Sequence, residues 1–173
     1  MVERKRLGEM LIDAGLINSA ELEDTLLNAK KAGLKLGQFL IKKGIVTENL
    51  IVDTVSQQTH IKKFDPTEYS ISEDIAKLMD VDSVNKFQAI PVVREDMVLT
   101  VAMVDPLDIL AIDYIEILTE MEVLPVICTE HNFNYLLSSI FGAYTGKDGV
   151  MQQVQEIQKM DVDKEEDSYQ SET

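Results

Sequence analysis

The 173-residue sequence contains no tryptophan, a single cysteine and two histidines. One cysteine, Cys128, excludes a disulfide framework within the chain and any metal site built from several thiolates. His60 and His131 stand far apart without a repeated carboxylate or thiolate spacing, so the sequence predicts no metal site. No segment approaches the roughly 18–20 consecutive apolar residues of a membrane helix, and no apolar signal core follows the first residues. This composition fits a cytoplasmic, soluble protein.

Basic side chains are also scarce: 16 Lys and Arg stand against 31 Asp and Glu, a formal charge of −15. This balance argues against DNA or RNA as a partner, because nucleic-acid phosphates need compensating cations. Residues 1–63 hold 10 basic and 8 acidic side chains, whereas residues 64–160 hold 5 and 17. If the chain binds a small anion, the first third is therefore the expected place, and the same lysines and arginines also fit ordinary solvated helix faces.

The first third of the chain is an internal duplication with an offset of 29 residues. Residues 6–17 (RLGEMLIDAGLI) align with residues 35–46 (KLGQFLIKKGIV), and the alignment extends over 24 positions with seven identities. Chance would give roughly one or two identities. Two copies are too few for a solenoid, so we expect a paired helical module.

Each copy predicts a short helix, a stop and a longer helix, from apolar residues at helical spacing. Stops and caps fall at the same places in both copies: Gly15 and Gly44 as stops, Asn18 and Thr47 as N-caps. The apolar stripe of the longer helix is predicted to be Leu22, Leu26 and Ala29 in the first copy, and Ile51 and Val55 in the second.

Gly8 and Gly37 lie near the starts of the two short helices. Alanine would be about 1 kcal/mol better inside a helix, so glycine at these positions needs another reason. Either a ligand or another helix comes close to the backbone there, and the sequence leaves both explanations open.

From residue 64 the pattern changes to short helices and strands. Residues 72–79 and 81–87 predict short helices, and residues 89–93 and 97–103 predict two strands of a hairpin that turns at Glu95-Asp96. These elements begin an α/β layer beside the helical module.

The next helix is expected to begin at Asp105-Pro106, with Asp105 as its N-cap. Its predicted apolar face consists of Leu107, Leu110, Ala111, Tyr114 and Leu118. A strand over 122–128 and a last helix capped by Thr129 follow, which gives one βαβ crossover. Cys128 ends this strand and is expected to be a buried small hydrophobe.

The predicted fold class is α+β: a duplicated helical N-terminal subdomain plus a small α/β subdomain with a roughly three-stranded sheet flanked by helices. The expected boundaries are 1–60 for the duplicated motif, 61–145 for the α/β subdomain, and 146–173 for a helical extension and acidic linker or tail. The last 13 residues hold six acids and one lysine and have little to bury.

The chain carries no pattern that predicts catalysis. Residues 142–148 (GAYTGKD) have three residues between the glycines instead of the four of a phosphate loop, and Asp148 replaces the required hydroxyl residue. No nucleophile elbow and no dinucleotide fingerprint occur. The sequence therefore predicts a protein that is not an enzyme and has no resident cofactor.

The repeat resembles a known domain. In the first copy Arg6-Leu7-Gly8 is followed by Gly-Leu-Ile at residues 15–17, and in the second Lys35-Leu36-Gly37 is followed by Gly-Ile-Val at residues 44–46. This repeated pattern is similar to the MshEN domain. That domain is the N-terminal region of ATPases of the GspE and PilB types, which drive type II secretion and type IV pilus assembly. Ile90-Pro91-Val92 followed by residues 101–106 (VAMVDP) looks like its second subdomain, and the resemblance covers about residues 4–142.

The resemblance implies a non-catalytic regulatory or docking domain that binds cyclic di-GMP, with one motif copy for each half of the ligand. The implied ligand-binding residues are Arg4, Arg6, Leu7, Gly8, Lys35, Leu36, Gly37, Gln58 and Asp105. For Asp105, helix capping is the competing role. Two positions depart from the family pattern: Ala29 stands where the first motif has glutamine, and Lys35 replaces an arginine.

The alternative function is a protein-interaction domain with a degenerate nucleotide site, which docks the ATPase to its partner. In both cases the implied partners are the cytoplasmic domain of an inner-membrane secretion or pilus assembly protein and the C-terminal ATPase domain of a longer chain. The implied location is the cytoplasm, peripheral at the inner membrane through that partner.

Overall fold

The structure is a computed structural model that describes residues 5–142. Within these residues the chain divides into two units, and the boundary lies between Phe133 and Asn134. The duplicated motif and the three-stranded sheet both belong to the first unit. The division at residues 60 and 61 stays a prediction, and the extension expected over 146–173 lies outside the described residues.

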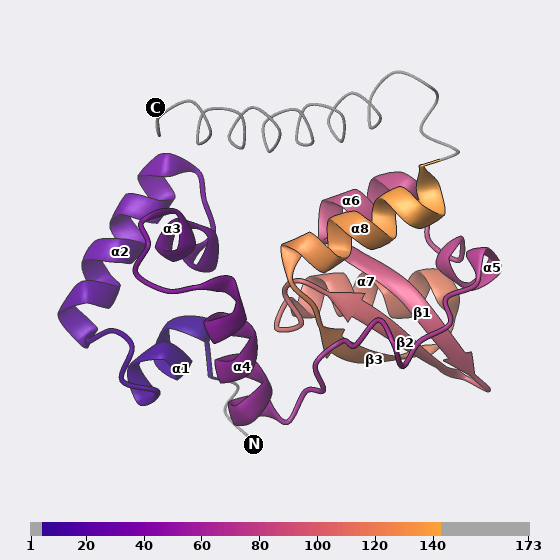
Figure 1. Ribbon diagram of the computed structural model, residues 1–173, viewed down its shortest axis with the longest axis horizontal. Coiled ribbons are helices and arrows are strands. Elements are labelled where there is room, and N and C mark those ends of the chain that lie inside the picture. Colours follow the sequence, from indigo (N-terminus) through magenta and orange to yellow (C-terminus); the bar gives the residue numbers. More distant parts are fainter. Residues whose placement is uncertain (1–4, 143–173) are drawn as a thin grey trace, which may run out of the picture. The chain divides into compact units, whose positions relative to one another are not determined.

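The duplicated motif folds as four helices (Figure 1): α1 (Leu7–Asp13), α2 (Ser19–Ala32), α3 (Leu36–Lys42) and α4 (Glu48–Thr59). The expected stops are confirmed, because Gly15 and Gly44 have φ angles of 72° and 70°, a region that favours glycine. The expected caps are confirmed as well. The Asn18 side chain accepts a hydrogen bond from the Glu21 backbone N–H, and Thr47 accepts one from Leu50.

The two copies pack across each other. α1 packs against α4, and α2 packs against α3, so that each helix pair joins one helix from each copy. Leu11 and Leu40 occupy the same place in the two copies, and both are fully buried in one cluster with Ile17 and Val46. The core of the duplicated motif is therefore shared between the copies.

Gly8 and Gly37 allow side chains to approach the short helices closely. A Cβ on Gly8 would lie 2.6 Å from Leu22 Cδ1, and a Cβ on Gly37 would lie 3.5 Å from Ile51 Cδ1. Leu22 and Ile51 are equivalent residues of the two copies, 29 positions apart. Packing of the longer helix therefore accounts for the first glycine, and the same arrangement recurs at the second with ordinary contact distances.

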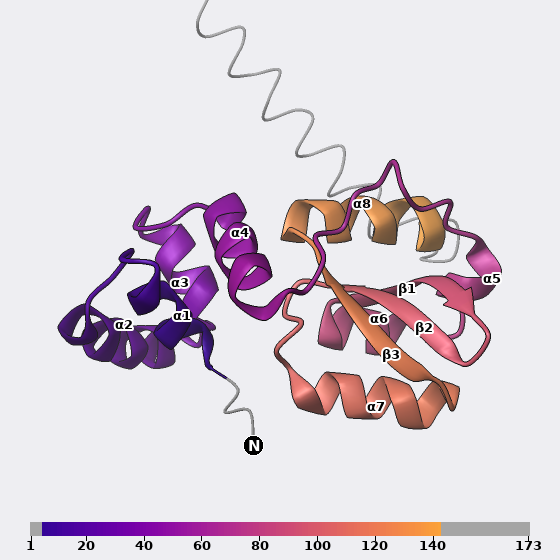
Figure 2. The same cartoon turned by 90° about the horizontal axis from the view of Figure 1, so that it is seen from below.

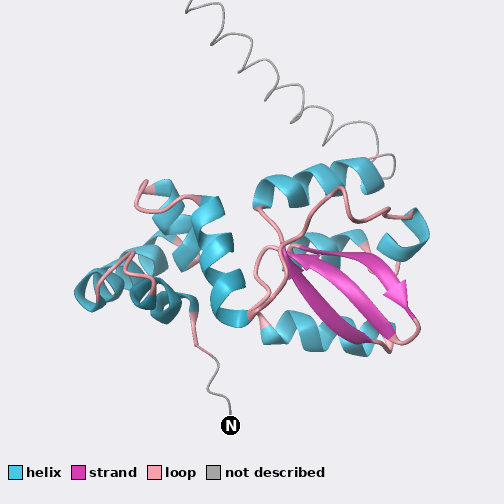
Figure 3. Cartoon of the chain, turned by 60° about the horizontal axis from the view of Figure 1, so that its bottom comes forward, coloured by secondary structure: helices cyan, strands magenta, loops and turns pink. Residues whose placement is uncertain are grey.

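The α/β part holds three strands, β1 (Ala89–Glu95), β2 (Val98–Met103) and β3 (Glu122–Ile127), in the order β1-β2-β3. β1 and β2 form the predicted antiparallel hairpin (Figure 3), and β3 is parallel to β2. The helices of this part are α5 (Glu73–Ala76), α6 (Val81–Phe87), α7 (Ile109–Thr119) and α8 (Glu130–Phe141). α7 connects β2 to β3 and packs on β3, which confirms the βαβ crossover.

The start of α7 differs from the prediction. Its N-cap is Asp108, whose side chain accepts a hydrogen bond from the Ala111 N–H at 3.1 Å. Asp105 instead begins a separate four-residue turn, in which its carbonyl oxygen accepts from the Asp108 N–H at 3.3 Å. Asp at the first and Pro at the second position are typical of a β-turn. The Asp-Pro pair is therefore a turn signal here, and the Asp105 carboxylate is not used to cap α7.

Two predicted core stripes also differ from the structure. In α7 the buried residues are Ala111 and Ile115, whereas Leu110 is 79% exposed. In α2 the buried residues are Thr25 and Ala29, whereas Leu26 is 47% exposed. Both helices carry apolar residues on more than one face, so spacing alone does not tell which face meets the core.

The outer edge of β3 is closed to a further strand. The N–H and C=O of Ile127 bond to Lys62 and Phe64, which shows that alternate residues of β3 turn their backbone groups away from β2. Two residues earlier Pro125 has no N–H, and before it the Val123 N–H donates to Glu116 Oε1 at 3.1 Å. Proline and side-chain caps of this kind protect sheet edges from pairing with other chains.

Within residues 5–142, no helix is long and apolar enough to cross a membrane, and no cluster of His, Cys, Asp and Glu is arranged to hold a metal ion.

Candidate functional site

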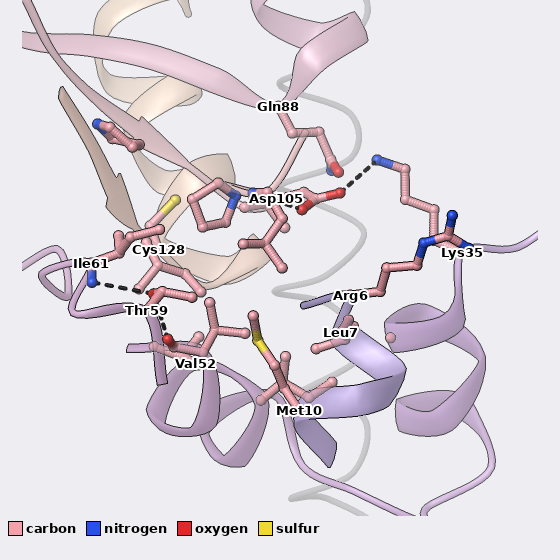
Figure 4. Close-up of a pocket in the computed structure, with 18 of the residues that line it drawn as sticks. Arg6, Leu7, Met10, Lys35, Val52, Thr59, Ile61, Gln88, Asp105 and Cys128 are labelled. Atoms are coloured by element: carbon pink, nitrogen blue, oxygen red, sulfur yellow. Dashed lines mark hydrogen bonds and ion pairs between the residues drawn. The ribbon is translucent and has the colours of Figure 1, made fainter. Parts of the chain in front are cut away.

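A pocket of about 1690 Å³ lies where the duplicated motif meets the α/β part (Figure 4). Its walls come from α1, α3 and α4 on one side and from the loop around Asp105, α7 and β3 on the other. No residue of α2, all of which the structure describes, lines the pocket. The two copies of the motif therefore contribute unequally: both short helices reach the pocket, but only the second long helix does.

Arg6 and Lys35 occupy the N-cap positions of α1 and α3 and bring cations from both copies to one end of the pocket. Their backbone N–H groups donate to the side chains of Glu9 at 2.9 Å and Gln38 at 3.2 Å. These bonds fix the start of each helix and leave the two long side chains to extend outward. Figure 4 shows them reaching toward the same end of the pocket.

Asp105 faces these cations from the α/β part. Its carboxylate lies 3.6 Å from Lys35 Nζ, and both side chains are partly exposed. The Arg6 guanidinium has no hydrogen bond or ion pair within residues 5–142, so it is available to a ligand. Gln88 lies beside Asp105 in Figure 4 and has a left-handed backbone, with φ of 48°. This end of the pocket thus holds two cations, one anion and an amide within reach of one small molecule.

Gln58 is one of three polar residues that α4 contributes to the same pocket, with Glu48 and Thr59. Its Nε2 donates to the Met10 carbonyl oxygen at 2.7 Å, while its buried Oε1 has no partner among the described residues. A buried acceptor without a donor costs free energy, so a donor presented to Oε1 would be stabilised. Ala29, the equivalent residue of the first copy, is buried in α2 and lies outside the pocket. A glutamine at position 29 would therefore not reach this pocket, contrary to what one motif copy per half-ligand implies.

The floor of the pocket is apolar. Leu7 and Ile51 pack against a buried cluster of Met10, Val52, Val55 and Ile127, which joins both parts of the unit. Apolar lining with charged groups beside it suits a ligand that has ring faces as well as charge.

Seven of the nine residues expected to bind a ligand line this one pocket: Arg6, Leu7, Lys35, Leu36, Gly37, Gln58 and Asp105. Gly8 is buried against Leu22 and is not part of the lining, and Arg4 lies outside the described residues. The sequence did not indicate Gln88, because its place depends on the end of α6 in the folded chain. Gln88 is the left-handed residue that ends α6 after Phe87, and this helix end was the one local signal that could have indicated it.

Cys128 borders the pocket but is not equipped as a nucleophile. Burial is the main cause that raises the pKa of its thiol to about 12, with a further contribution from the Glu48 carboxylate. The thiol therefore stays protonated at neutral pH, and its expected role as a buried small hydrophobe is confirmed. Glu48 in turn accepts a hydrogen bond from the Glu130 backbone N–H, which ties α4 to the segment after β3.

Two curated proteins are similar to the chain. The type IV pilus assembly ATPase PilB of Myxococcus xanthus is 31% identical over 125 residues, and that of Thermus thermophilus is 30% identical over 136 residues. These alignments cover 72% and 78% of this chain but only 22% and 15% of the relatives. The chain thus spans about a fifth or less of the length of the relatives it matches.

Solved structures share the fold. The structure of MshE with cdg has a TM-score of 0.68 and 26% sequence identity, and the match covers 79% of this chain and 99% of that one. The N-terminal domain of XpsE has a TM-score of 0.65 and 20% identity, covering 80% and 97%. These likenesses confirm the predicted α+β class and its division into helices and a small sheet.

The profile of the MshEN domain matches residues 59–146. This match falls on the α/β part, although the resemblance in the sequence rested mainly on the duplicated motif before it. Since the profile covers the α/β part and the MshE structure covers both, the chain belongs to the MshEN domain family.

Proposed function

We propose that this chain binds cyclic di-GMP in the pocket between the duplicated motif and the α/β part. The observation that carries the proposal is the convergence of Arg6 and Lys35, one from each copy, with Asp105 in a single pocket. The similarity to MshE, whose structure contains cdg, supports it, with cdg taken as cyclic di-GMP. The Gly37 backbone, with Leu7 and Leu36 beside it, forms the apolar part of the proposed site.

The ligand's chemistry matches the charges at the rim. Cyclic di-GMP has two phosphates, which need cations, and two guanines with flat faces and hydrogen-bonding edges. A guanidinium such as that of Arg6 can hold a phosphate or the acceptor edge of a guanine with two parallel hydrogen bonds, whereas the Lys35 ammonium acts as a point charge. The unpartnered Oε1 of Gln58 accepts a hydrogen bond from the ligand.

Asp105 is proposed to select guanine. A carboxylate repels phosphate but accepts hydrogen bonds from the neighbouring N–H donors on the pairing edge of guanine, which adenine lacks. In the free chain Asp105 is held near Lys35; in the complex the guanine edge takes the carboxylate and a phosphate takes the lysine. We therefore expect wild type to prefer cyclic di-GMP over cyclic di-AMP, and Asp105→Ala to lose most of that preference in parallel titrations.

The whole-protein role follows from the relatives. We infer that the chain is a non-catalytic regulatory domain of a type II secretion or type IV pilus assembly ATPase, whose nucleotide hydrolysis resides in another domain. In this arrangement it couples cyclic di-GMP, or the cytoplasmic domain of an inner-membrane assembly protein, to the motor. Its place would be the cytoplasm at the inner membrane.

The decisive experiment is titration calorimetry with cyclic di-GMP. Arg6→Ala should weaken binding by about 1.5–3 kcal/mol, or roughly ten- to a hundredfold, because it removes a charge-assisted contact of a side chain without another partner. Lys35→Arg should leave binding unchanged or tighten it, since it supplies the planar fork.

Lys42→Ala is the matched control, because Lys42 is an exposed cation of α3 that does not line the pocket. Binding that is indifferent to Arg6→Ala would place the ligand elsewhere. No heat with the wild-type chain would favour the alternative, a protein-docking domain whose nucleotide site has decayed.

A further inference from the structure

A second surface, distinct from the pocket, lies on the outer face of α7. Leu110 and Ile117 are 79% and 80% exposed, and Tyr114 and Leu118 are exposed between and beside them. These four residues recur at helical spacing and form one stripe, which we call the α7 stripe. Figure 2 shows α7 running along the sheet with its outer side uncovered by other described elements. A contiguous apolar patch of this kind marks an interaction surface.

The surroundings of the α7 stripe are acidic. Between residues 95 and 142 the sequence contains nine Asp and Glu and no Lys or Arg. Asp113 and Glu120 are exposed along one edge of the stripe. α6, which contacts Tyr114 through Phe87 and Ser83, adds Asp82 and one cation, Lys86. The occupant of the stripe must therefore offer apolar side chains together with positive charge.

The structure narrows the form of this occupant. The edge of β3, on which α7 packs, is closed by Pro125 and by the side chain of Glu116, so a partner cannot add a strand at this edge. An anionic membrane surface would be repelled by the same carboxylates. A helix that lays an apolar, basic face along α7 fits both constraints.

The chain itself carries such a face on α2. Leu26 and Leu27 are 47% and 54% exposed, and the next turn presents Lys30 and Lys31 to solvent. Glu23 and Asp24 lie one turn earlier, so the basic character belongs to the C-terminal half of the helix. Residues 1–63 are the only third of the chain with more basic than acidic side chains. α2 is also the helix of the duplicated motif that does not line the pocket.

We propose that the α7 stripe of one copy of this chain packs against the Leu26–Lys31 face of α2 in the next copy. Leu26 and Leu27 then cover Leu110 and Ile117, while Lys30 and Lys31 approach Asp113 and Glu120. Because the two surfaces differ, the contact is heterologous, and repeating it generates a ring or an open chain of copies. The contact borders the pocket at Asp113, which also lines it.

The test is a charge exchange followed by sedimentation velocity over a range of protein concentrations at low salt. Wild type should show a concentration-dependent rise in sedimentation coefficient that salt suppresses. Asp113→Lys/Glu120→Lys and, separately, Lys30→Glu/Lys31→Glu should each weaken self-association at least about tenfold, because each places like charges opposite one another. Mixing the two variants should restore association, since each offers the other a complementary face.

Matched controls separate this contact from general charge effects. Glu73→Lys/Asp74→Lys makes the same change in net charge at exposed positions of α5, which packs on β1, and should leave self-association unchanged. Ile117→Ser should abolish it, whereas Leu124→Ser, at a leucine of β3 that is 54% exposed, should not. A chain that is monomeric at every concentration, or association that survives both reversals or is not restored by mixing, overturns the proposal.

Discussion

The two copies of the duplicated motif have the same arrangement of helices, but their long helices face different surroundings. Both have a capped short helix, a left-handed glycine at the same place and a fully buried leucine, Leu11 or Leu40, in a shared core. Their long helices differ: α4 lines the pocket and contacts the α/β part, whereas α2 lines no part of it. Duplication has preserved what holds the helices together, and the residues of the outer faces have diverged.

The divergence is visible at equivalent positions. Val55 is 2% exposed in the cluster that joins the two parts, while Leu26, 29 residues earlier, is largely open to solvent. Gln58 bonds to the Met10 carbonyl across the copies, while its counterpart Ala29 is simply buried. The repeat therefore predicts equal roles for the leucines of the shared core, but not for residues such as Val55 and Gln58.

The largest expected effect tests the shared core. Leu11→Ala and Leu40→Ala should each lower the free energy of unfolding by about 2–5 kcal/mol, because each leaves a cavity at a fully buried site. The double variant should be non-additive, since both leucines belong to one cluster. Urea unfolding of the three variants measures this, and a large loss for one leucine with little for the other would break the equivalence of the copies.

The second prediction sharpens the difference between the long helices. Val55→Ala should cost about 2 kcal/mol, from the lost burial of its methyl groups and the space they leave. Leu26→Ala removes more carbon atoms but should cost under about 1 kcal/mol, because the side chain is already half in water. The smaller side chain, Val55, is thus expected to contribute more to the free energy of unfolding than the larger Leu26. Equal losses in thermal or urea unfolding would mean that α2 is covered in solution.

The smallest effects concern the caps. The Asn18 cap is reciprocal, since the Glu21 carboxylate also accepts from the Asn18 N–H at 2.8 Å, whereas Leu50 stands at the place of Glu21 in the second copy. Asn18→Ala should therefore cost about 1 kcal/mol, and Thr47→Ala somewhat less. Leu50→Glu should supply the missing half of the second capping box. If unfolding shows no gain from it, the loss of the Leu50 side chain outweighs the new bond.

Local signals were predictable from the sequence, and tertiary choices were not. Gly15, Gly44, Asn18 and Thr47 act through their own backbone neighbours, so their roles could be predicted from spacing alone. The exposure of Leu110 could not, because α7 is apolar on two sides and only the position of β3 decides which side is covered.

The candidate site shows the same division. Arg6 and Lys35 were found through the repeat, whereas Asp105 was expected either to bind the ligand or to cap a helix whose N-cap is in fact Asp108, three residues later. Sequence spacing did not indicate that one oxygen of the Asp105 carboxylate accepts from the Leu107 N–H at 3.2 Å while the other faces Lys35. The pocket is lined by residues that are far apart in the sequence, and composition and periodicity do not predict such long-range contacts.

The crossed packing of α1 with α4 and α2 with α3 makes the two copies depend on each other for folding. Leu11 and Leu40 belong to one cluster, so neither copy alone could bury its leucine. A single copy of the motif would need a second copy, on the same chain or on another, to complete that core.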